Sequence, residues 1–338
     1  MRAISGMHPR FDRWSSVALP AVVGALGLFL AACQGDAPTG VPGGSGSDVI
    51  TPFTIVPGAG TAVALSTNRV VHTSTTLYGQ SPTPGHAMAS TRGTLVNSPW
   101  DLTNFGGPVI TSATSRNVYV NCPTTPANCW GTVTLTPATF LRDLNVSNLI
   151  AIANQYLSED AAGKFGVTEM KTTAKFVNHT ASMKDIFSIV FSASEAAHAS
   201  GYHNIFHVFL PQGTDMCMDA THCYSPDKPS TFIFCAFHGS VDFGAKHVIF
   251  TVEPFQFVGG CVLPNQTRVI DGTASTLSHE FIETITDPDG DAWFSGLTSN
   301  EIGDLCFVFR NSQVVGTRAY TVQEEYSNTI HNCTSGAF

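Results

Sequence analysis

One stretch of the chain brings together an imidazole and several carboxylates at spacings that suit a metal site. His279 and Glu283 are four residues apart, so on a helix they lie one turn above each other and point the same way. A hydrolytic zinc site needs three protein ligands, an open position for water and a carboxylate that takes a proton from that water. We therefore predict that His279, Glu283 and Glu301 bind the metal. Glu280 is the predicted catalytic base, and Asp304 is predicted to accept the free ring N–H of His279.

The apolar pattern around these residues predicts the helix that must hold them. The apolar residues that recur at helical spacing are Leu277, Phe281, Ile282 and Ile285. They occupy one arc of the helical wheel, and His279, Glu280 and Glu283 occupy the opposite arc. Pro288 ends the helix directly after Asp287. A surface helix can carry the same polar residues on its solvent face, so this simpler interpretation competes with the metal site.

The pattern His279-Glu280-x-x-Glu283, followed by Glu301-x-x-Asp304, resembles the motif of the thermolysin-type zincins. In those proteins the second ligand is histidine, whereas here it is Glu283. A carboxylate adds negative charge, makes the metal a weaker acid and tolerates calcium or manganese better. Zinc is therefore the expected metal and calcium the alternative, and the site is either a modified or an inactive zincin site.

A second resemblance covers the chain from about Gly106 to Cys333 and is to the phosphate-induced, EXORDIUM-like proteins and their bacterial relatives. The segments that carry it are Gly106–Thr111, Cys235–Ser240, Ser278–Pro288, Glu301–Cys306 and Val322–Asn328. The resemblance implies a secreted or wall-associated protein, linked in plants to growth responses and without a settled biochemical activity.

The N-terminal residues predict export and lipid anchoring. Residues 1–32 contain three arginines and an apolar run from Val17 to Leu30, and small residues precede Cys33, as in a bacterial lipoprotein signal peptide. Residues 33–59 are rich in Gly, Pro, Ser and Thr, which predicts a flexible tether. Lipidation at Cys33 would anchor the chain to a membrane, and Gln34 after it favours the outer membrane or cell surface.

Residues 60–338 are long enough for a single domain with a substantial core. The chain carries 16 Lys and Arg against 25 Asp and Glu, a formal net charge of −9. This acidic balance disfavours nucleic acid as a partner. A peptide or a cell-wall component remains the expected ligand.

Besides Cys33 the chain has eight cysteines, an even number that predicts up to four disulfides in an exported protein. Cys122 with Cys129, and Cys217 with Cys223, would close short local loops. The spacing does not determine the other pairs. A thiolate zinc site is less favoured because no Cys-x-x-Cys pair is present.

Hydrophobic patterns predict the remaining elements. Helices are expected at 147–157 and 182–199, strands at 205–210, 231–237 and 247–252, a strand pair within 108–121, and a hairpin of 306–309 with 319–323. Together with the metal-bearing helix, these elements predict a disulfide-stapled α+β fold with a zincin-like mixed sheet.

Three other groups of residues are candidate sites. His203 and His207 are expected to be core or surface histidines and not ligands. His238 can be a donor to a substrate or metal, or the cap of a turn, and both interpretations stay open. The alternate carboxylates from Asp287 to Asp291 suit calcium but lack EF-hand spacing, so a helix-terminating turn is favoured.

Two hypotheses for function follow. The first is a surface-anchored zinc metallohydrolase that acts on peptides. The second is a non-enzymatic envelope protein of the EXORDIUM-like type, whose metal is structural. An accessible groove beside His279 would favour the first hypothesis, and burial of the polar helix face would favour the second.

Overall fold

The computed structural model describes residues 50–56, 71–72 and 98–336. The predicted signal peptide and the lipidation site Cys33 lie outside these residues, as does most of the predicted tether. Within the predicted tether range, Thr51–Pro52 form strand β1, and Phe53 donates its backbone N–H to the carbonyl of Lys171. In the described part of the chain, no helix has the length and apolar character that crossing a membrane requires.

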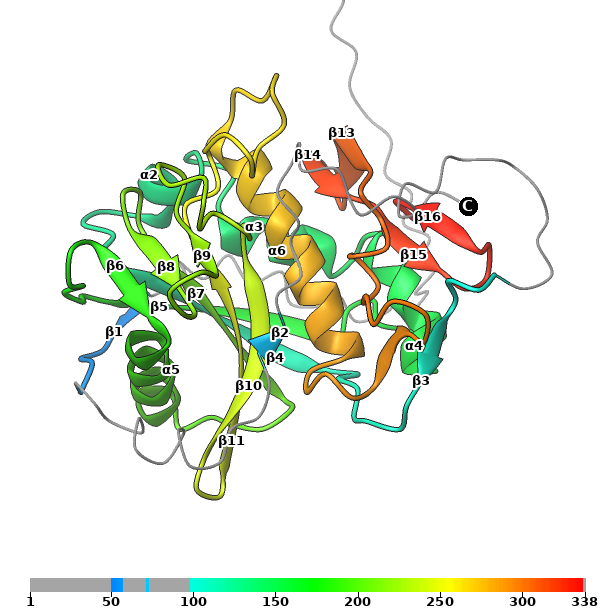
Figure 1. Cartoon of the computed structure of the whole chain (residues 1–338), viewed down its shortest axis with the longest axis horizontal. Coiled ribbons are helices and arrows are strands. Elements are labelled where there is room, and N and C mark those ends of the chain that lie inside the picture. The colour runs from blue at the N-terminus through cyan, green and yellow to red at the C-terminus, as the bar shows by residue number, and fades with distance from the viewer. Residues whose placement is uncertain (1–49, 57–70, 73–97, 337–338) are drawn as a thin grey trace, which may run out of the picture. The chain divides into compact units, whose positions relative to one another are not determined.

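The main sheet has seven strands in the order β1-β5-β4-β7-β11-β10-β2 (Figure 1). Their bounds are β1 Thr51–Pro52, β5 Phe165–Thr172, β4 Ala113–Val120, β7 Asn204–Phe209, β11 Lys246–Glu253, β10 Phe237–Phe243 and β2 Val71–His72. The first five strands in this order pair in parallel, whereas β10 is antiparallel to both of its neighbours. The sheet is therefore mixed, and the fold is α+β as predicted.

Helices cover the two faces of this sheet. Along β7, Ile205 and Phe209 face one apolar cluster, and Phe206 and Val208 face the other, as the two-residue period of a strand requires. The first cluster is built with α3 (Pro137–Leu144), η1 (Ile150–Ala153), α4 (Asn154–Leu157) and α6 (Val269–Thr286). The second is built with α5 (Met183–Ala197) and the small sheet β6 (Thr180–Ser182), β8 (Asp215–Cys217) and β9 (Cys223–Tyr224). Figure 1 shows α5 and α6 on opposite sides of β10 and β11.

The remaining elements are short. They are α2 (Pro126–Trp130) and three two-stranded sheets: β3 (Leu102–Asn104) with β12 (Trp293–Ser295), β13 (Phe309–Val315) with β14 (Arg318–Gln323), and β15 (Glu325–Ser327) with β16 (Asn332–Thr334).

The helix expected around His279 is present and longer than predicted. It runs from Val269 to Thr286 and ends at Asp287, directly before Pro288. Leu277 and Phe281 join the first apolar cluster, as the helical pattern predicted. The polar side of α6 is also buried, because β14, β10 and β11 pack against the helix. A solvent-facing surface helix is therefore excluded.

Several of the other predicted helices and strands are present in the structure. The helix at 182–199 is confirmed as α5, whose Ser182 and Asp185 form a capping box. Strands at 205–210 and 247–252 are also confirmed. A hairpin with its second strand at the predicted place forms as β13–β14, but β13 starts at Phe309, where the predicted first strand 306–309 ends.

Three segments differ from the prediction. The helix expected at 147–157 is divided into η1 and α4, and the strand pair expected within 108–121 is the single strand β4. The strand expected at 231–237 is wrong, because the strand begins at Phe237 and continues to Phe243. The aromatic residues Phe232 and Phe234 are buried without a continuous ladder, so their strand-like composition misplaced the element.

The eight cysteines other than Cys33 all form disulfides. The two predicted local loops, Cys122–Cys129 and Cys217–Cys223, are confirmed. The longer pairs are Cys235–Cys261 and Cys306–Cys333, and they connect segments 26 and 27 residues apart. The prediction of up to four disulfides is therefore confirmed.

Candidate metal centre

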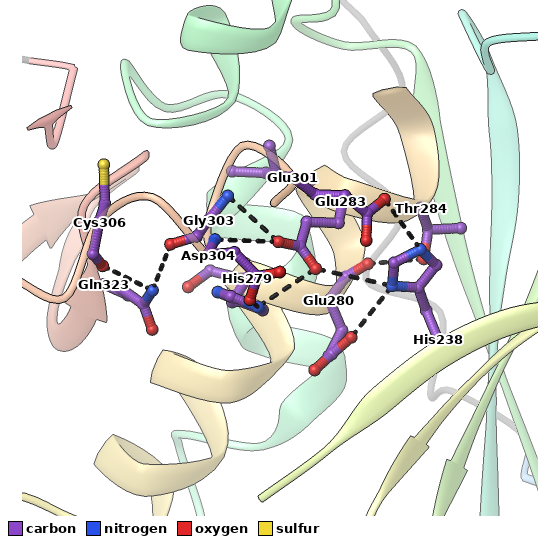
Figure 2. Close-up of polar contacts among 12 residues, drawn as sticks. His238, His279, Glu280, Glu283, Thr284, Glu301, Gly303, Asp304, Cys306 and Gln323 are labelled. Carbon is purple, nitrogen blue, oxygen red and sulfur yellow. Dashed lines mark hydrogen bonds and ion pairs between the residues drawn. The ribbon is translucent and has the colours of Figure 1, made fainter. Parts of the chain in front are cut away.

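Three segments bring histidines and carboxylates to one buried place (Figure 2). The polar side of α6 contributes His279, Glu280 and Glu283, and the strand β10, which contacts α6, contributes His238. The loop before Cys306 contributes Glu301 and Asp304. We refer to these six residues as the α6 cluster: His238, His279, Glu280, Glu283, Glu301 and Asp304.

The first group of potential ligands is centred on His279. Its Nε2 lies 3.2 Å from Oε2 of Glu283 and 3.9 Å from Oδ1 of Asp304. The three residues offer ligand atoms that all lie within 4.8 Å of one another. One nitrogen and two carboxylate oxygens at this separation are able to hold a divalent metal ion.

The second group is centred on His238 and shares Glu283 with the first. Nδ1 of His238 lies 3.2 Å from Oε2 of Glu280 and 3.6 Å from Oε2 of Glu283. These ligand atoms also lie within 4.8 Å of one another. The opposite ring nitrogen, Nε2, lies 3.5 Å from Oε1 of Glu301.

The backbone fixes the orientation of the Glu283 carboxylate. Its Oε1 accepts hydrogen bonds from the N–H groups of Gly303 and Asp304, each 3.2 Å long. Oε2 is therefore left pointing between the two histidine rings, as Figure 2 shows. The loop itself is held by Gln323 of β14, which donates to the carbonyls of Gly303 and Cys306.

Gly303 is needed for this close approach. A Cβ atom on Gly303 would lie 2.3 Å from Nδ1 of His279 and 3.0 Å from Oε2 of Glu325. Nδ1 of His279 and the carboxylate of Glu325 therefore both lie on the side of Gly303 where a Cβ atom would stand. Only glycine leaves room for the ring and the carboxylate together.

Burial makes negative charge costly in the cluster. Burial raises the pKa of Glu301 to about 8, an effect that the nearby His238 opposes. Burial likewise raises the pKa of Asp304, of Glu325 and of Glu253 at the end of β11 well above the usual range. A bound cation would offset this cost.

The histidine pKa values move in the complementary direction. Burial by itself lowers the pKa of an imidazole, but the adjacent carboxylates outweigh it. Glu301 and Glu280 raise the pKa of His238, and Glu283 raises the pKa of His279, in both cases well above the usual value. The cluster thus attracts positive charge.

Unsatisfied polar atoms fit a metal ligand set. His279 is 1% exposed, and neither of its ring nitrogens makes a hydrogen bond with any residue that the structure describes. Within the same described ranges, Oε1 of Glu301 and both carboxylate oxygens of Glu325 also lack a hydrogen-bond partner. Buried polar atoms are normally paired, so these atoms fit a site for a cation.

The structure brings the predicted residues together in a changed arrangement. His279 and Glu283 are adjacent as expected, and the cluster could hold a metal ion. Asp304 approaches Nε2 of His279, the same nitrogen that Glu283 approaches, and not the opposite nitrogen. Glu301 belongs to neither ligand group within the described residues and lies beside His238. The ligand role of Glu301 and the base role of Glu280 stay predictions.

Sequence reasoning did not assign His238, Glu253 or Glu325 to the site. The sequence contained an indication for each of them. Each is an ionisable residue near the start or end of an apolar strand, where a polar side chain is unusual. For His238, the strand position decides between the two open interpretations, because residue 238 lies within β10 and does not cap a turn.

The other candidate residues have structural partners. His207 is a core histidine of β7 that contacts Thr251 Oγ1 at 2.9 Å and Ser115 Oγ at 3.0 Å. Asp287 accepts the N–H of Ala292 within the turn that follows α6. Both observations agree with the interpretations favoured from the sequence.

No known family model, curated protein or solved structure matches this chain.

Proposed function

We propose that this chain is an exported, surface-anchored metalloprotein that binds a divalent metal ion at His279, Glu283 and Asp304 and hydrolyses peptides. Zinc is the first metal to test, because imidazole with carboxylate is a common zinc ligand set. The oxygen-rich donor set also suits manganese or calcium.

The observation that carries the proposal is the environment of His279. This ring is almost fully buried, both of its nitrogens lack a hydrogen bond to any described residue, and Nε2 faces two carboxylates. A core histidine normally resembles His207, with both ring nitrogens partnered. The contrast between these two buried histidines supports a ligand role for His279.

A divalent metal ion in such a site lowers the pKa of a water molecule and polarises a carbonyl group. The residues of the chain would provide the rest. Gly303 and Asp304 hold Oε1 of Glu283 through their backbone N–H groups and thus orient the ligand. Glu280, on the same side of α6, is the proposed proton acceptor, and His238, 3.2 Å from its Oε2, can stabilise the carboxylate.

The proposed location rests on the sequence. A basic start, an apolar run and small residues before Cys33 support lipidation there and anchoring in a bacterial outer membrane or cell surface. The resemblance to EXORDIUM-like proteins supports an envelope location in the same way.

A specific observation favours a second candidate function. His279, Glu280, Glu283 and Glu301 are each at most 2% exposed, and Asp304, with 16% of its side chain exposed, is the most accessible member of the cluster. Burial of the polar side of α6 is the result expected of a non-enzymatic protein, since a metal held this deeply suits a structural role. The second candidate is therefore a non-enzymatic envelope protein that binds a wall component, with the metal stabilising its fold.

Metal analysis of the purified full chain tests the proposal. We expect the wild-type chain to bind zinc. The double variant His279→Ala and Glu283→Ala, which lacks two of the three proposed ligands, should lose the ion that they hold. Cleavage of a peptide library that stops on chelation and returns with zinc would support the hydrolase. Bound metal without cleavage would favour the structural candidate, and a wild-type chain that binds no divalent metal would overturn both.

A further inference from the structure

The two histidines of the α6 cluster belong to different ligand groups, and Glu283 belongs to both. His279 is grouped with Glu283 and Asp304, and His238 is grouped with Glu283 and Glu280. Ligand atoms around one zinc lie about 2.0–2.2 Å from the ion, so two of them are separated by at most about 4.4 Å. The histidines share no group at the wider limit of 4.8 Å within the described residues. A single ion does not reach both rings in this arrangement.

Oε2 of Glu283 lies where it can bind two ions at once, one beside each histidine. This oxygen lies 3.2 Å from Nε2 of His279 and 3.6 Å from Nδ1 of His238. Two backbone N–H groups occupy the other oxygen of Glu283, so Oε2 remains directed between the rings. An oxygen shared by two ions places them about 3.5–4 Å apart, the spacing of two-metal hydrolytic sites.

Each histidine also has a further carboxylate in its surroundings. Nε2 of His238 faces Glu301 at 3.5 Å, and Nδ1 of His279 borders Gly303 together with Glu325. Metal-bound histidines commonly donate their other ring N–H to a carboxylate, which fixes the tautomer and strengthens the ligand. His238 therefore shows the order shared carboxylate, imidazole, outer carboxylate. Glu325 lies near the Nδ1 side of His279 without a hydrogen bond to that nitrogen.

The balance of charge favours more than one cation. The two groups and their outer carboxylates contain four glutamates and one aspartate against two imidazoles, all in a largely buried region. One divalent ion leaves most of this negative charge uncompensated. A second divalent ion brings the cluster closer to neutrality.

We propose that the α6 cluster binds two divalent transition-metal ions that share Oε2 of Glu283, one with His279 and Asp304 and the other with His238 and Glu280. This inference rests on the proposed function, since it adds a second ion to the site proposed there. With two ions bound, Glu280 is a ligand of the second ion in place of the proton-acceptor role that it has in the one-ion site, and Glu301 orients His238.

Metal stoichiometry tests the inference without any activity assay. Metal-free full chain is loaded with Zn²⁺, freed of excess ion and analysed for metal per chain. We expect two zinc ions in the wild-type chain, one in His238→Ala and one in His279→Ala. Loading with Mn²⁺ provides a second readout, since a pair of ions sharing an oxygen gives an exchange-coupled electron paramagnetic resonance spectrum that His238→Ala converts to that of an isolated ion.

The controls separate this inference from the proposed function. His203→Ala, an exposed histidine outside the cluster, should keep two ions. Glu280→Gln preserves side-chain shape and should retain only one, which guards against a folding defect in His238→Ala. One zinc in the wild-type chain, unchanged in His238→Ala, would overturn the second ion and leave the proposed function intact. Two ions that persist in His238→Ala would also overturn it, and no bound ion would overturn both proposals.

Discussion

Glu283 shows how one side chain can serve two purposes when its oxygens differ in surroundings. Oε1 accepts two backbone N–H groups from the loop, and Oε2 faces the histidines. Because the carboxylate is planar and rigid, the two hydrogen bonds that hold Oε1 also restrict the position of Oε2. Oε2 is therefore already oriented, which would lower the cost of binding an ion there.

Gly303 is the residue at which this positioning is most sensitive. In Gly303→Ala the new methyl group would overlap Nδ1 of His279, so the ring or the loop must move. Displaced ligand orientation typically costs about 10-fold to 100-fold in metal affinity. We expect a loss of this size in zinc affinity, measured by competition with a fluorescent chelator.

Gly296→Ala is the matched control for this substitution. Gly296 lies in the same region of the chain, and a Cβ atom there would meet only the Phe105 ring at 3.8 Å, an ordinary contact. Its zinc affinity should equal that of the wild-type chain. Equal affinities for Gly303→Ala and Gly296→Ala would show that His279 does not bind the metal in the described position.

At the scale of elements, the cluster depends on α6 being held from two sides. Leu277 and Phe281 anchor the apolar side of the helix in the core, and β10 and β14 enclose the polar side. The loop with Gly303 and Asp304 completes the site, and the backbone N–H of Tyr326 in β15 donates to the carbonyl of Ile302. A backbone hydrogen bond thus joins the loop to β15.

The disulfide Cys306–Cys333 connects this loop to β16, the partner of β15. Replacing both cysteines by alanine should leave the loop less restrained and weaken zinc binding by about 10-fold or more, as expected when groups that orient the ligands are loosened. Isothermal titration of metal-free chain with Zn²⁺ would measure the change.

The pair Cys217–Cys223 offers a control of the same chemistry. It lies in the three-stranded sheet with β8 and β9, against the opposite face of the main sheet from α6. Its removal should leave zinc affinity unchanged. Similar losses in both double variants would mean that general stability, and not the loop, controls binding.

At the scale of the whole molecule, a row of polar side chains crosses the main sheet beneath α6. Glu169, Asn117, His207, Thr251 and His238 are successive register partners on five neighbouring strands. All five are buried. The row ends at the α6 cluster, so a polar row crosses a face whose neighbouring residues, such as Ile205 and Phe209, belong to the apolar core.

His207 connects this row to acid stability. Burial lowers its pKa from 6.5 to about 3, so the folded chain keeps it neutral while the unfolded chain protonates it below pH 6.5. The unfolded state then binds more protons, and the free energy of unfolding falls as the pH drops from 6.5 toward 3. Between pH 7 and pH 5, the titration of His207 lowers the free energy of unfolding by about 2 kcal/mol.

Urea unfolding at pH 7 and pH 5 would measure this effect. His207→Gln should lose about 2 kcal/mol less than the wild-type chain between these two pH values, since glutamine does not titrate. His203→Gln, at an exposed position, should keep the wild-type difference. If His207→Gln and the wild-type chain lose the same amount, His207 is not held neutral in the folded protein.

The sequence by itself determined the local features of this protein. The helix around His279, its end at Pro288, the i and i+4 pair of His279 and Glu283, and the two short disulfide loops all follow from spacing within a few residues. Helical periodicity and short loop closure depend on neighbouring residues alone, so these features are predictable.

Tertiary structure alone decided which side chains meet at the site. His238 reaches Glu280 because β10 pairs with β11 in a particular register, and Glu301 lies beside His238 because the loop folds back over α6. Residue types and spacing do not encode these long-range contacts, which come from packing distant segments into one core. The composition of the cluster was therefore predictable in part, but its division into two ligand groups that share Glu283 was not.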